Sequence, residues 1–334
     1  DFADIQEIEV LRGPRGSVYG KNTSAGAIHL TAKAPSFAFE GKAEISVGNL
    51  GFKQAKASIS GPVSDTLAFR LGVAATTRNG TIYNVTSNQL INAQEFLGIR
   101  GALLWRATDN LDITLSGDFN LQNPNCCAQI YARYGSTQRA ANRQYPALAA
   151  AFGYAVPSTD PYDRLTDVDA QLNARNELGG ASIRAEWDLG AGSLTSVTAW
   201  RYWEWSPSND RDFTGLPITT KSQNPTSQRQ YTQELRYAQS GETIDFVAGL
   251  FGFYQKLHTT GQQVQGTAAS RFLLSPPSSG TCTPTSTVLQ SRCARRPDRR
   301  KRHPVQEYQL RGLRPVDLAR HRQAGHPARP ARQL

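Results

Sequence analysis

The stretch Leu111–Phe119 reads "LDITLSGDF", and its residues alternate strictly between two kinds. Leu, Ile, Leu, Gly and Phe occupy the odd positions, whereas Asp, Thr, Ser and Asp occupy the even ones. Because successive side chains of a strand point to opposite faces of the sheet, this period of two predicts a strand with one apolar and one polar face. The stretch therefore indicates an all-β fold whose sheet separates two different environments.

Eight further segments repeat this alternation. Their lengths cluster near the roughly 9 to 11 residues that a tilted strand needs to cross a bilayer, whereas strands of soluble proteins average roughly 5 to 6 residues. The alternation is less clear in Leu194–Trp203, and the inward face of this segment is not evident from its sequence. The eight segments are Phe39–Val47, Lys53–Ser60, Leu67–Arg78, Phe96–Arg106, Gly179–Trp187, Leu194–Trp203, Arg229–Tyr237 and Ile244–Tyr254.

The connections between these nine predicted strands have 5, 6, 17, 4, 59, 6, 25 and 6 residues. After the first hairpin, tight and long connections alternate, which places the long ones at one end of the sheet. Transmembrane β-barrels of the outer membrane have this asymmetry, with short periplasmic turns and long outer loops. Lipid offers no hydrogen-bond partners, so such a sheet must close on itself. A soluble all-β protein is the alternative that the pattern leaves open.

Charge is distributed unevenly along the 334 residues, whose formal net charge is +10. Residues 291–334 hold twelve Arg and one Lys against three acidic residues, so the preceding part of the chain is neutral. We therefore expect a disordered basic C-terminal tail and no nucleic-acid partner. The tail is either a natural basic arm or the product of a shifted reading frame. Since no run of about 18 to 20 apolar residues occurs, a membrane-spanning helix is not expected.

The N-terminal stretch "IEVLRGPRGSVYGKNTSAGAIHLTAKAP", Ile8–Pro35, has two strand-like runs on either side of a segment rich in glycine and proline. It closely resembles the C-terminal half of the plug domain of TonB-dependent outer-membrane receptors, apart from Ala25 and His29, where that pattern usually has Gly and Asn. The resemblance continues to about Tyr254.

This resemblance implies a partial transmembrane antiparallel β-barrel preceded by the C-terminal part of a plug domain. The expected divisions are residues 1–36 for the plug, 37–256 for the first barrel strands, and 257–334 for a loop and an aberrant Arg/Pro-rich tail. Plugged transporters have 22 strands, so we expect this chain to be a fragment. A signal peptide, the TonB-binding segment, the first half of the plug and the rest of the barrel are expected to belong to the intact receptor.

The resemblance also implies a function, namely active uptake of a scarce ligand such as a ferric siderophore across the outer membrane of a Gram-negative bacterium. The implied partners are TonB with the inner-membrane energy-coupling complex, the lipid of the outer membrane, and an iron-siderophore or similar ligand. No cofactor is implied, and the fragment itself is not expected to transport. The alternatives are a passive porin-like channel and a soluble β-rich binding protein with a basic arm.

Within the plug, glycines and prolines are expected to form tight turns, because Gly adopts conformations closed to other residues. Plug arginines of the family pair with barrel carboxylates. Arg12 and Glu234 are therefore candidates for a latch between plug and barrel, although Glu234 could instead pair locally with Arg184 or Arg236. The candidate turn residues are Gly13, Pro14, Gly16, Tyr19, Gly20 and Gly26.

The long predicted loops are expected to hold the ligand. Tyr131 and Tyr134, in the middle of the longest loop, are the candidate ligand-binding residues. The aromatic residues between Trp200 and Trp205 are better interpreted as an interfacial girdle.

No enzyme motif such as GxSxG, HExxH or a P-loop occurs, so we do not expect an enzyme. The four cysteines lack the CxxC spacing of a zinc site, and no metal site is expected. Cys126 and Cys127 lie in the longest loop, where one of them could bridge to distant Cys282 or Cys293, or where both could be ordinary loop residues.

Overall fold

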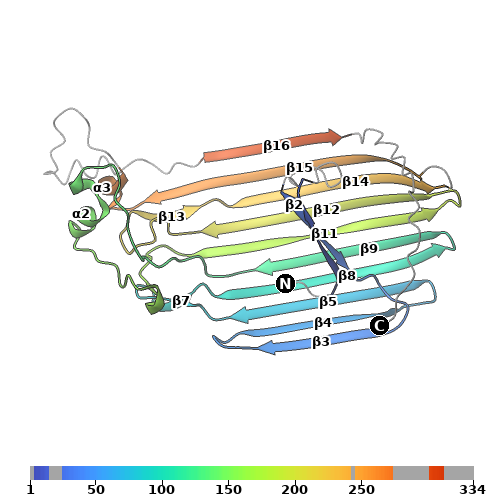
Figure 1. Cartoon of the computed structure of the whole chain (residues 1–334), viewed down its shortest axis with the longest axis horizontal. Coiled ribbons are helices and arrows are strands. Elements are labelled where there is room, and N and C mark those ends of the chain that lie inside the picture. Colours follow the sequence, from blue (N-terminus) through green and yellow to red (C-terminus); the bar gives the residue numbers. More distant parts are fainter. Residues whose placement is uncertain (1–3, 15–24, 242–244, 274–300, 312–334) are drawn as a thin grey trace, which may run out of the picture.

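One large antiparallel sheet dominates the computed structural model, which describes residues 4–14, 25–241, 245–273 and 301–311 (Figure 1). Nine strands lie side by side in chain order, and they confirm the nine predicted strands. They are β3 (Glu40–Val47), β4 (Lys53–Pro62), β5 (Leu67–Arg78), β8 (Gln94–Thr108), β9 (Leu111–Gln122), β11 (Asn173–Asp188), β12 (Ser193–Ser208), β14 (Thr226–Ser240) and β15 (Asp245–Gln265). Strands β13 (Thr219–Gln223) and β16 (Lys301–Arg311) pair with β15.

The strands from β8 onward extend further than their sequence patterns predicted. Strands β11 and β12 each have 16 residues and β15 has 21. The predicted boundary at residue 256 is wrong, because β15 continues to Gln265 and helix α3 (Ala269–Leu273) follows it. The expectation of a wholly disordered tail is also wrong for residues 301–311, which form β16 alongside β15. The rest of the tail lies outside the described residues.

Long and short connections lie at opposite ends of the sheet, as predicted from their lengths. Two residues, Asp109 and Asn110, separate β8 from β9, whereas residues 123–172 separate β9 from β11. The long connections contain nearly all the remaining elements and gather at the left of Figure 1. We call this the loop end. The remaining elements are β6 (Ile82–Asn84), β7 (Gln89–Ile91), β10 (Leu165–Thr166), α2 (Tyr145–Ala150), η1 (Ala141–Arg143) and η2 (Pro161–Asp163).

The two faces of the sheet differ as the alternation predicted. One face, here called the outer face, presents large apolar side chains to the surroundings. The opposite, inner face carries small and polar residues, as in β5, where Ala68, Arg70 and Ala74 are buried. The exposed apolar side chains of the outer face include Leu71, Val73, Ile99, Leu103, Leu115, Ile183, Leu235 and Leu250. Such a face is suited to contact with lipid.

Aromatic side chains form a row on the outer face toward the loop end. Trp200 of β12 is paired with Tyr231 of β14, which is paired in turn with Tyr254 of β15. All three rings are partly exposed, and Trp200 also stacks on Tyr202 with ring centroids 5.5 Å apart. The register thereby assigns the face that the sequence left open: Trp200 points outward and Arg201 inward. Aromatic girdles of this kind border the lipid-facing band of transmembrane barrels.

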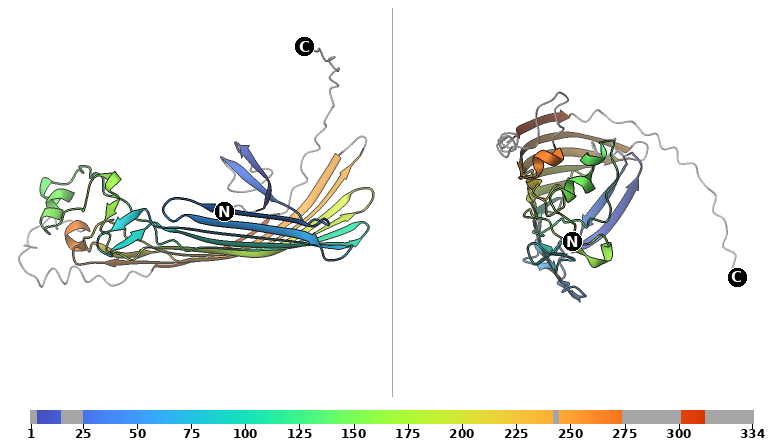
Figure 2. Two further views of the ribbon diagram at one scale, coloured as in Figure 1. Left: turned by 90° about the horizontal axis from the view of Figure 1, so that it is seen from below. Right: turned by 90° about the vertical axis from the view of Figure 1, so that its left-hand side faces the viewer.

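A separate two-stranded hairpin, β1 (Ile5–Arg12) and β2 (Gly26–Ala32), stands over the inner face of the sheet (Figure 2). It corresponds to the two strand-like runs of the N-terminal stretch. Residues 33–39 then lead directly into β3. The large sheet is thus curved beside a small sheet on its inner side, which is the arrangement expected for part of a plugged barrel.

No helix in the described part of the chain is long and apolar enough to cross a membrane.

Candidate functional site

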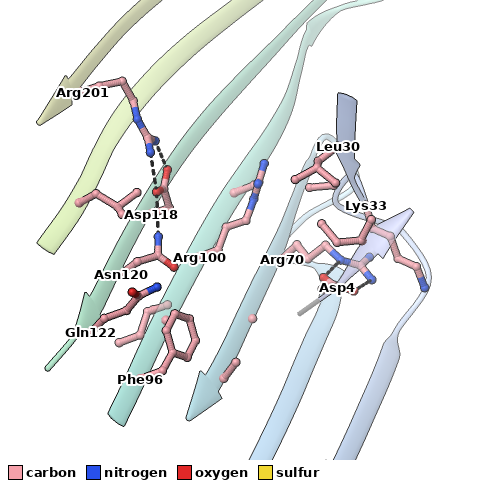
Figure 3. Close-up of a pocket in the computed structure, with 18 residues that line it drawn as sticks. Asp4, Leu30, Lys33, Arg70, Phe96, Arg100, Asp118, Asn120, Gln122 and Arg201 are labelled. Atoms are coloured by element: carbon pink, nitrogen blue, oxygen red, sulfur yellow. Dashed lines mark hydrogen bonds and ion pairs between the residues drawn. The ribbon is translucent and has the colours of Figure 1, made fainter. Parts of the chain in front are cut away.

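A single arginine of the wall holds the start of the hairpin (Figure 3). The Arg70 guanidinium of β5 donates to both carboxylate oxygens of Asp4, with Nη2 2.9 Å from Oδ1. Its Nη1 donates to the carbonyl oxygen of Ala34 at 3.0 Å and lies 3.4 Å from the Glu40 carboxylate. Arg70 therefore joins the residue before β1, the second residue after β2 and the first residue of β3. We call these contacts the Arg70 latch.

The sequence of β5 explains why Arg70 can reach the hairpin. The alternation places Arg70 on the inner face, next to Ala68, Gly72 and Ala74, whose side chains are small. A Cβ built on Gly72 would lie 3.7 Å from the Asp4 Cβ, so a larger side chain at this position would push the hairpin away. Asp4 itself has a φ of 63°, a left-handed conformation that Asp tolerates better than most residues.

The latch is largely removed from water, since the Arg70 and Asp4 side chains are 8% and 10% exposed. The hydrogen bond from Arg70 lowers the pKa of Asp4 below its ordinary value, and this outweighs the opposing effect of burial. Removing one partner of a buried pair typically costs about 3–5 kcal/mol, because the other charge is left uncompensated. Displacement of the hairpin from the wall must overcome a penalty of this kind.

The linker between hairpin and sheet is fastened at a second place. The Arg106 guanidinium of β8 lies 4.0 Å from the centroid of the Phe37 ring, within the range of a cation–π contact. The Ser36 amide donates to the Ser60 hydroxyl at 2.9 Å, and that hydroxyl donates to the Phe69 carbonyl at 2.7 Å. Ser60 is fully buried, so the linker is bonded to the wall where water is excluded.

The structure does not bring together the predicted latch residues. Glu234 lies on the inner face of β14 and forms its ion pair with Arg236, at 3.8 Å, which is the local pairing that the sequence left open. Arg12, at the end of β1, is exposed, and no ion pair links it to another described residue. Among the described residues, Asp4 and Arg70 instead form an ion pair between the start of the hairpin and the wall.

Two of the predicted turn glycines take conformations that favour glycine. Gly13 has a φ of 80° and donates its amide to the Ala25 carbonyl at 3.1 Å, where the chain leaves β1. Gly26 has a φ of 149°, and a Cβ at this position would collide with the carbonyl of Leu11. Pro14 is exposed just beyond this point. Gly16, Tyr19 and Gly20 lie outside the described residues.

The tyrosines that were predicted to bind ligand come together at the loop end. Tyr131 stacks on Tyr145 of α2 with centroids 5.2 Å apart, and Tyr134 lies 5.2 Å from the same ring. Tyr145 in turn packs against Phe272 of α3. We call Tyr131, Tyr134 and Tyr145 the tyrosine cluster. Sequence analysis missed Tyr145, which lies in a different part of the same loop and has no motif around it.

Burial raises the pKa of both Tyr131 and Tyr145 above the ordinary phenol value. These phenols therefore stay protonated at neutral pH, so they can offer ring faces and neutral hydrogen-bond groups but no phenolate. Tyr134 is 47% exposed and gives the cluster an accessible edge.

Three carboxylates connect two outer loops next to this cluster. Asp210, fully buried, accepts hydrogen bonds from the backbone amides of Asp169, Asp212 and Phe213 at 3.2, 3.0 and 2.8 Å. Burial raises the pKa of Asp210 to about 7 and that of Asp169 to about 6. Asp212 accepts from the Thr219 amide at 2.8 Å, and burial raises its pKa as well. We call this the acidic loop junction.

Cys126 and Cys127 are bonded to each other, so the predicted bridge from one of them to a distant cysteine is not formed. Cys282 and Cys293 lie outside the described residues. Over the described ranges, no group of three or more His, Cys, Asp or Glu side chains is arranged to hold a metal ion.

Comparison with known proteins places this geometry among siderophore receptors. The chain is 29% identical over 118 residues to the ferrioxamine receptor of Yersinia enterocolitica, an alignment that covers 35% of this chain and 15% of the receptor. It is 35% identical over 68 residues to the pesticin receptor of Yersinia pestis, covering 20% of this chain and 10% of that protein. No family model matches the chain.

Solved structures show the same fold. The ferric yersiniabactin uptake receptor FyuA of Yersinia pestis superposes with a TM-score of 0.64 at 18% identity, covering 79% of this chain and 38% of that one. The siderophore receptor PiuA of Acinetobacter baumannii gives a TM-score of 0.59 at 13% identity, covering 78% and 36%.

The chain thus spans well under half the length of these relatives, which are receptors and not enzymes. The resemblance seen in the N-terminal stretch is confirmed by them. The chain is therefore similar in sequence to TonB-dependent siderophore receptors, and its fold matches part of such receptors.

Proposed function

We propose that this chain contributes plug and wall to a receptor that takes up a ferric siderophore across the outer membrane of a Gram-negative bacterium. Binding occurs at the loop end, and energy delivered through TonB displaces the plug. The names of the relatives, which include receptors for ferrioxamine and ferric enterobactin, support a siderophore as cargo.

The observation that carries the proposal is the Arg70 latch. It ties a hairpin to the inner face of a sheet whose outer face is apolar. A passive channel has no use for a segment held inside its wall. A buried ion pair is also a suitable restraint for a displacement that is driven by energy from TonB, because separating the pair leaves a buried charge without its partner.

Ligand binding is assigned in this proposal to Tyr131 and Tyr134, joined by Tyr145. The cluster combines ring faces with neutral hydroxyl groups, which suits an organic chelate better than a bare metal ion. Its position at the loop end, away from the short turns, agrees with a ligand that arrives from outside the cell. The turn glycines Gly13 and Gly26 are proposed to keep the hairpin compact enough to fit over the wall.

The proposal is tested in cells that express a whole receptor containing this chain, by uptake of radioactive iron carried as ferrioxamine B, ferric enterobactin or ferric yersiniabactin. Uptake of at least one chelate that stops when tonB is deleted is the expected result. Uptake that continues without TonB would favour the porin-like alternative.

Cell fractionation provides the matched test of location. The chain is expected in the outer-membrane fraction and is expected to require detergent for extraction. Recovery of folded chain from the periplasm in plain buffer would favour the soluble β-rich binding protein.

A further inference from the structure

A cavity of about 360 Å³ lies between the hairpin and the inner face of the wall (Figure 3). Strands β5, β8, β9 and β12 contribute most of its charged and polar lining, while Asp4, Lys33 and the ends of β1 and β2 border it on the hairpin side. Four basic side chains and two acidic ones line it, namely Lys33, Arg70, Arg100, Arg201, Asp4 and Asp118. The cavity therefore has an excess of positive charge.

Both acidic groups are already neutralised by close partners. Asp4 is held by Arg70 in the latch. The two oxygens of Asp118 accept from the guanidinium of Arg201, with Nη2 3.0 Å from Oδ2, and the Asn120 amide donates to the same Oδ2 at 3.3 Å. No carboxylate that lines the cavity is left for a further cation.

Among the residues that the structure describes, Arg100 has no such partner. It lies directly opposite Asp118 in the register of β8 and β9, yet Asp118 is engaged by Arg201. Within the described ranges, Arg100 takes part in no hydrogen bond or ion pair, and its guanidinium lies between the two ion pairs in Figure 3. A guanidinium carries five N–H donors in a planar fork that matches a carboxylate.

The rest of the lining suits the body of an organic ligand. Phe96, Leu178 and Leu30 supply apolar surface, and Gln122 with Asn120 supplies amides near the Phe96 end. A cavity of this size accommodates a carboxylate-bearing group of a chelate, and apolar walls with a few polar anchors are typical of small-molecule sites.

We propose that this cavity is a binding site for an organic carboxylate, with Arg100 as its charged anchor. The identity of the physiological ligand rests on the proposed function. In that case, the cargo that passes the hairpin carries a negatively charged carboxylate group. Arg201 is a secondary contact, because it becomes available only when Asp118 releases it.

Citrate is the probe, titrated calorimetrically into the full chain in detergent micelles at low and moderate salt. Charge-assisted hydrogen bonds contribute about 1.5–3 kcal/mol. Arg100→Gln is therefore expected to bind citrate at least about tenfold more weakly, since 1.4 kcal/mol corresponds to a factor of ten. Arg100→Lys, which keeps the charge, is expected to retain more of the affinity than Arg100→Gln. Asp118→Asn is expected to bind more tightly, because it frees Arg201.

Arg184→Gln is the matched control, because Arg184 is also on the inner face but pairs with Glu186 away from the cavity. It should leave citrate affinity within about twofold, and the uncharged triethyl ester of citrate should not bind to the unmodified chain. Equal affinity of the Arg100→Gln and Arg184→Gln variants, or absence of citrate binding by the unmodified chain, would overturn the proposal.

These results are independent of the uptake assay. TonB-dependent uptake that is unaffected by Arg100→Gln would show that the receptor function stands and that this site plays no part in it. Citrate binding anchored by Arg100, in a whole receptor that supports no TonB-dependent iron uptake, would show the reverse.

Discussion

Arg201 of β12 reaches across the intervening strand β11 to form its ion pair with Asp118 of β9, and it passes directly over Gly180. Gly180 is paired with Arg201 on one side and with Asp118 on the other. A Cβ at Gly180 would lie 2.8 Å from the Arg201 Cδ and would also collide with the Trp200 carbonyl. The missing side chain of Gly180 is therefore what allows the two charged groups to meet.

Gly180→Ala is expected to break this pair and to lower the free energy of unfolding by about 1–3 kcal/mol, the usual range for overpacking. Urea denaturation in detergent, followed by tryptophan fluorescence, measures the change. Gly252→Ala on β15 is the control, because the nearest atom to a Cβ there is 3.9 Å away. Equal loss of stability in both variants would show that the cause is a general effect of alanine in a strand. The crossing of Arg201 over Gly180 would then not be the cause.

Asp4→Asn is expected to loosen the hairpin while the wall stays folded. The substitution leaves the Arg70 guanidinium buried without its main counter-charge, which should destabilise docking of β1 and β2 by about 3 kcal/mol. Hydrogen exchange of residues 5–12 and 26–32 should then accelerate, with unchanged circular dichroism.

Arg236→Gln is the corresponding control, since the Arg236 and Glu234 side chains are 46% and 36% exposed and such pairs contribute about 0–1 kcal/mol. Exchange in the hairpin should not respond to it. A response to Arg236→Gln as large as that to Asp4→Asn would restore Glu234 as a residue of the latch.

The strands and their two different faces could be predicted from the sequence because alternation is a local property. Arg70 could in principle have been found as well, since it is the large charged residue among small inward neighbours in "LAFRLGVAATTR". Its partner could not, because Asp4 is brought to it by the path of the linker, which no local pattern encodes. Because no local pattern shows which residues meet across the linker, the prediction of Arg12 as a latch residue depended only on the family motif that contains it.

The sequence predicted that the long loops lie at one end of the sheet, but it did not predict how these loops pack. Tyr131 and Tyr134 are close in sequence and were proposed together, but Tyr145 and Phe272 reach them through packing of α2 and α3. These helices have six and five residues, respectively, and depend on the surrounding core for stability. Leu148, Leu216 and Ile218 form part of that core, and they come from two different loops.

The acidic loop junction should make the outer loops pH-dependent. The pKa of Asp210 is raised by burial to about 7, well above the value of about 3.9 for an unfolded Asp. The stabilisation from this group is therefore fully present below about pH 4 and is lost as the pH rises through about 7. Protection factors of residues 209–219 in hydrogen exchange should be higher at pH 5 than at pH 8.

Asp210→Asn should weaken this pH dependence, whereas Asp163→Asn should not, because Asp163 is exposed in the loop between β9 and β11 and takes no part in the acidic loop junction. Asp169, with a pKa of about 6, is expected to leave a residual slope of the same sign. Protection that increases from pH 5 to pH 8 would contradict the interpretation.

Tyr134→Ala should weaken binding of the transported ferric siderophore by about three- to tenfold, since a well-placed aromatic contact contributes about 0.5–1.5 kcal/mol. Tyr134→Phe should retain most of the affinity, because the proposed contact is the ring. Tyr162→Ala serves as control, as Tyr162 is 90% exposed in the same loop and outside the tyrosine cluster. Quenching of intrinsic fluorescence gives the three dissociation constants, and equal values for Tyr134→Ala and Tyr162→Ala would remove the cluster from the ligand site.

Neighbouring positions on β11 provide a direct test of which face meets lipid. Ile183 is on the outer face and 51% exposed, whereas Ser182 points inward. A lysine on the lipid-facing side costs about 2–4 kcal/mol at the middle of the bilayer and much less in a polar lumen. Ile183→Lys should therefore reduce the yield of inserted protein in refolding into lipid vesicles, and Ser182→Lys should have a small effect. If Ser182→Lys were the more damaging variant, the face that carries the hairpin would be the one that meets lipid. A lipid-facing hairpin is incompatible with the buried Arg70–Asp4 pair. That result would therefore overturn the assignment of both the wall and the plug.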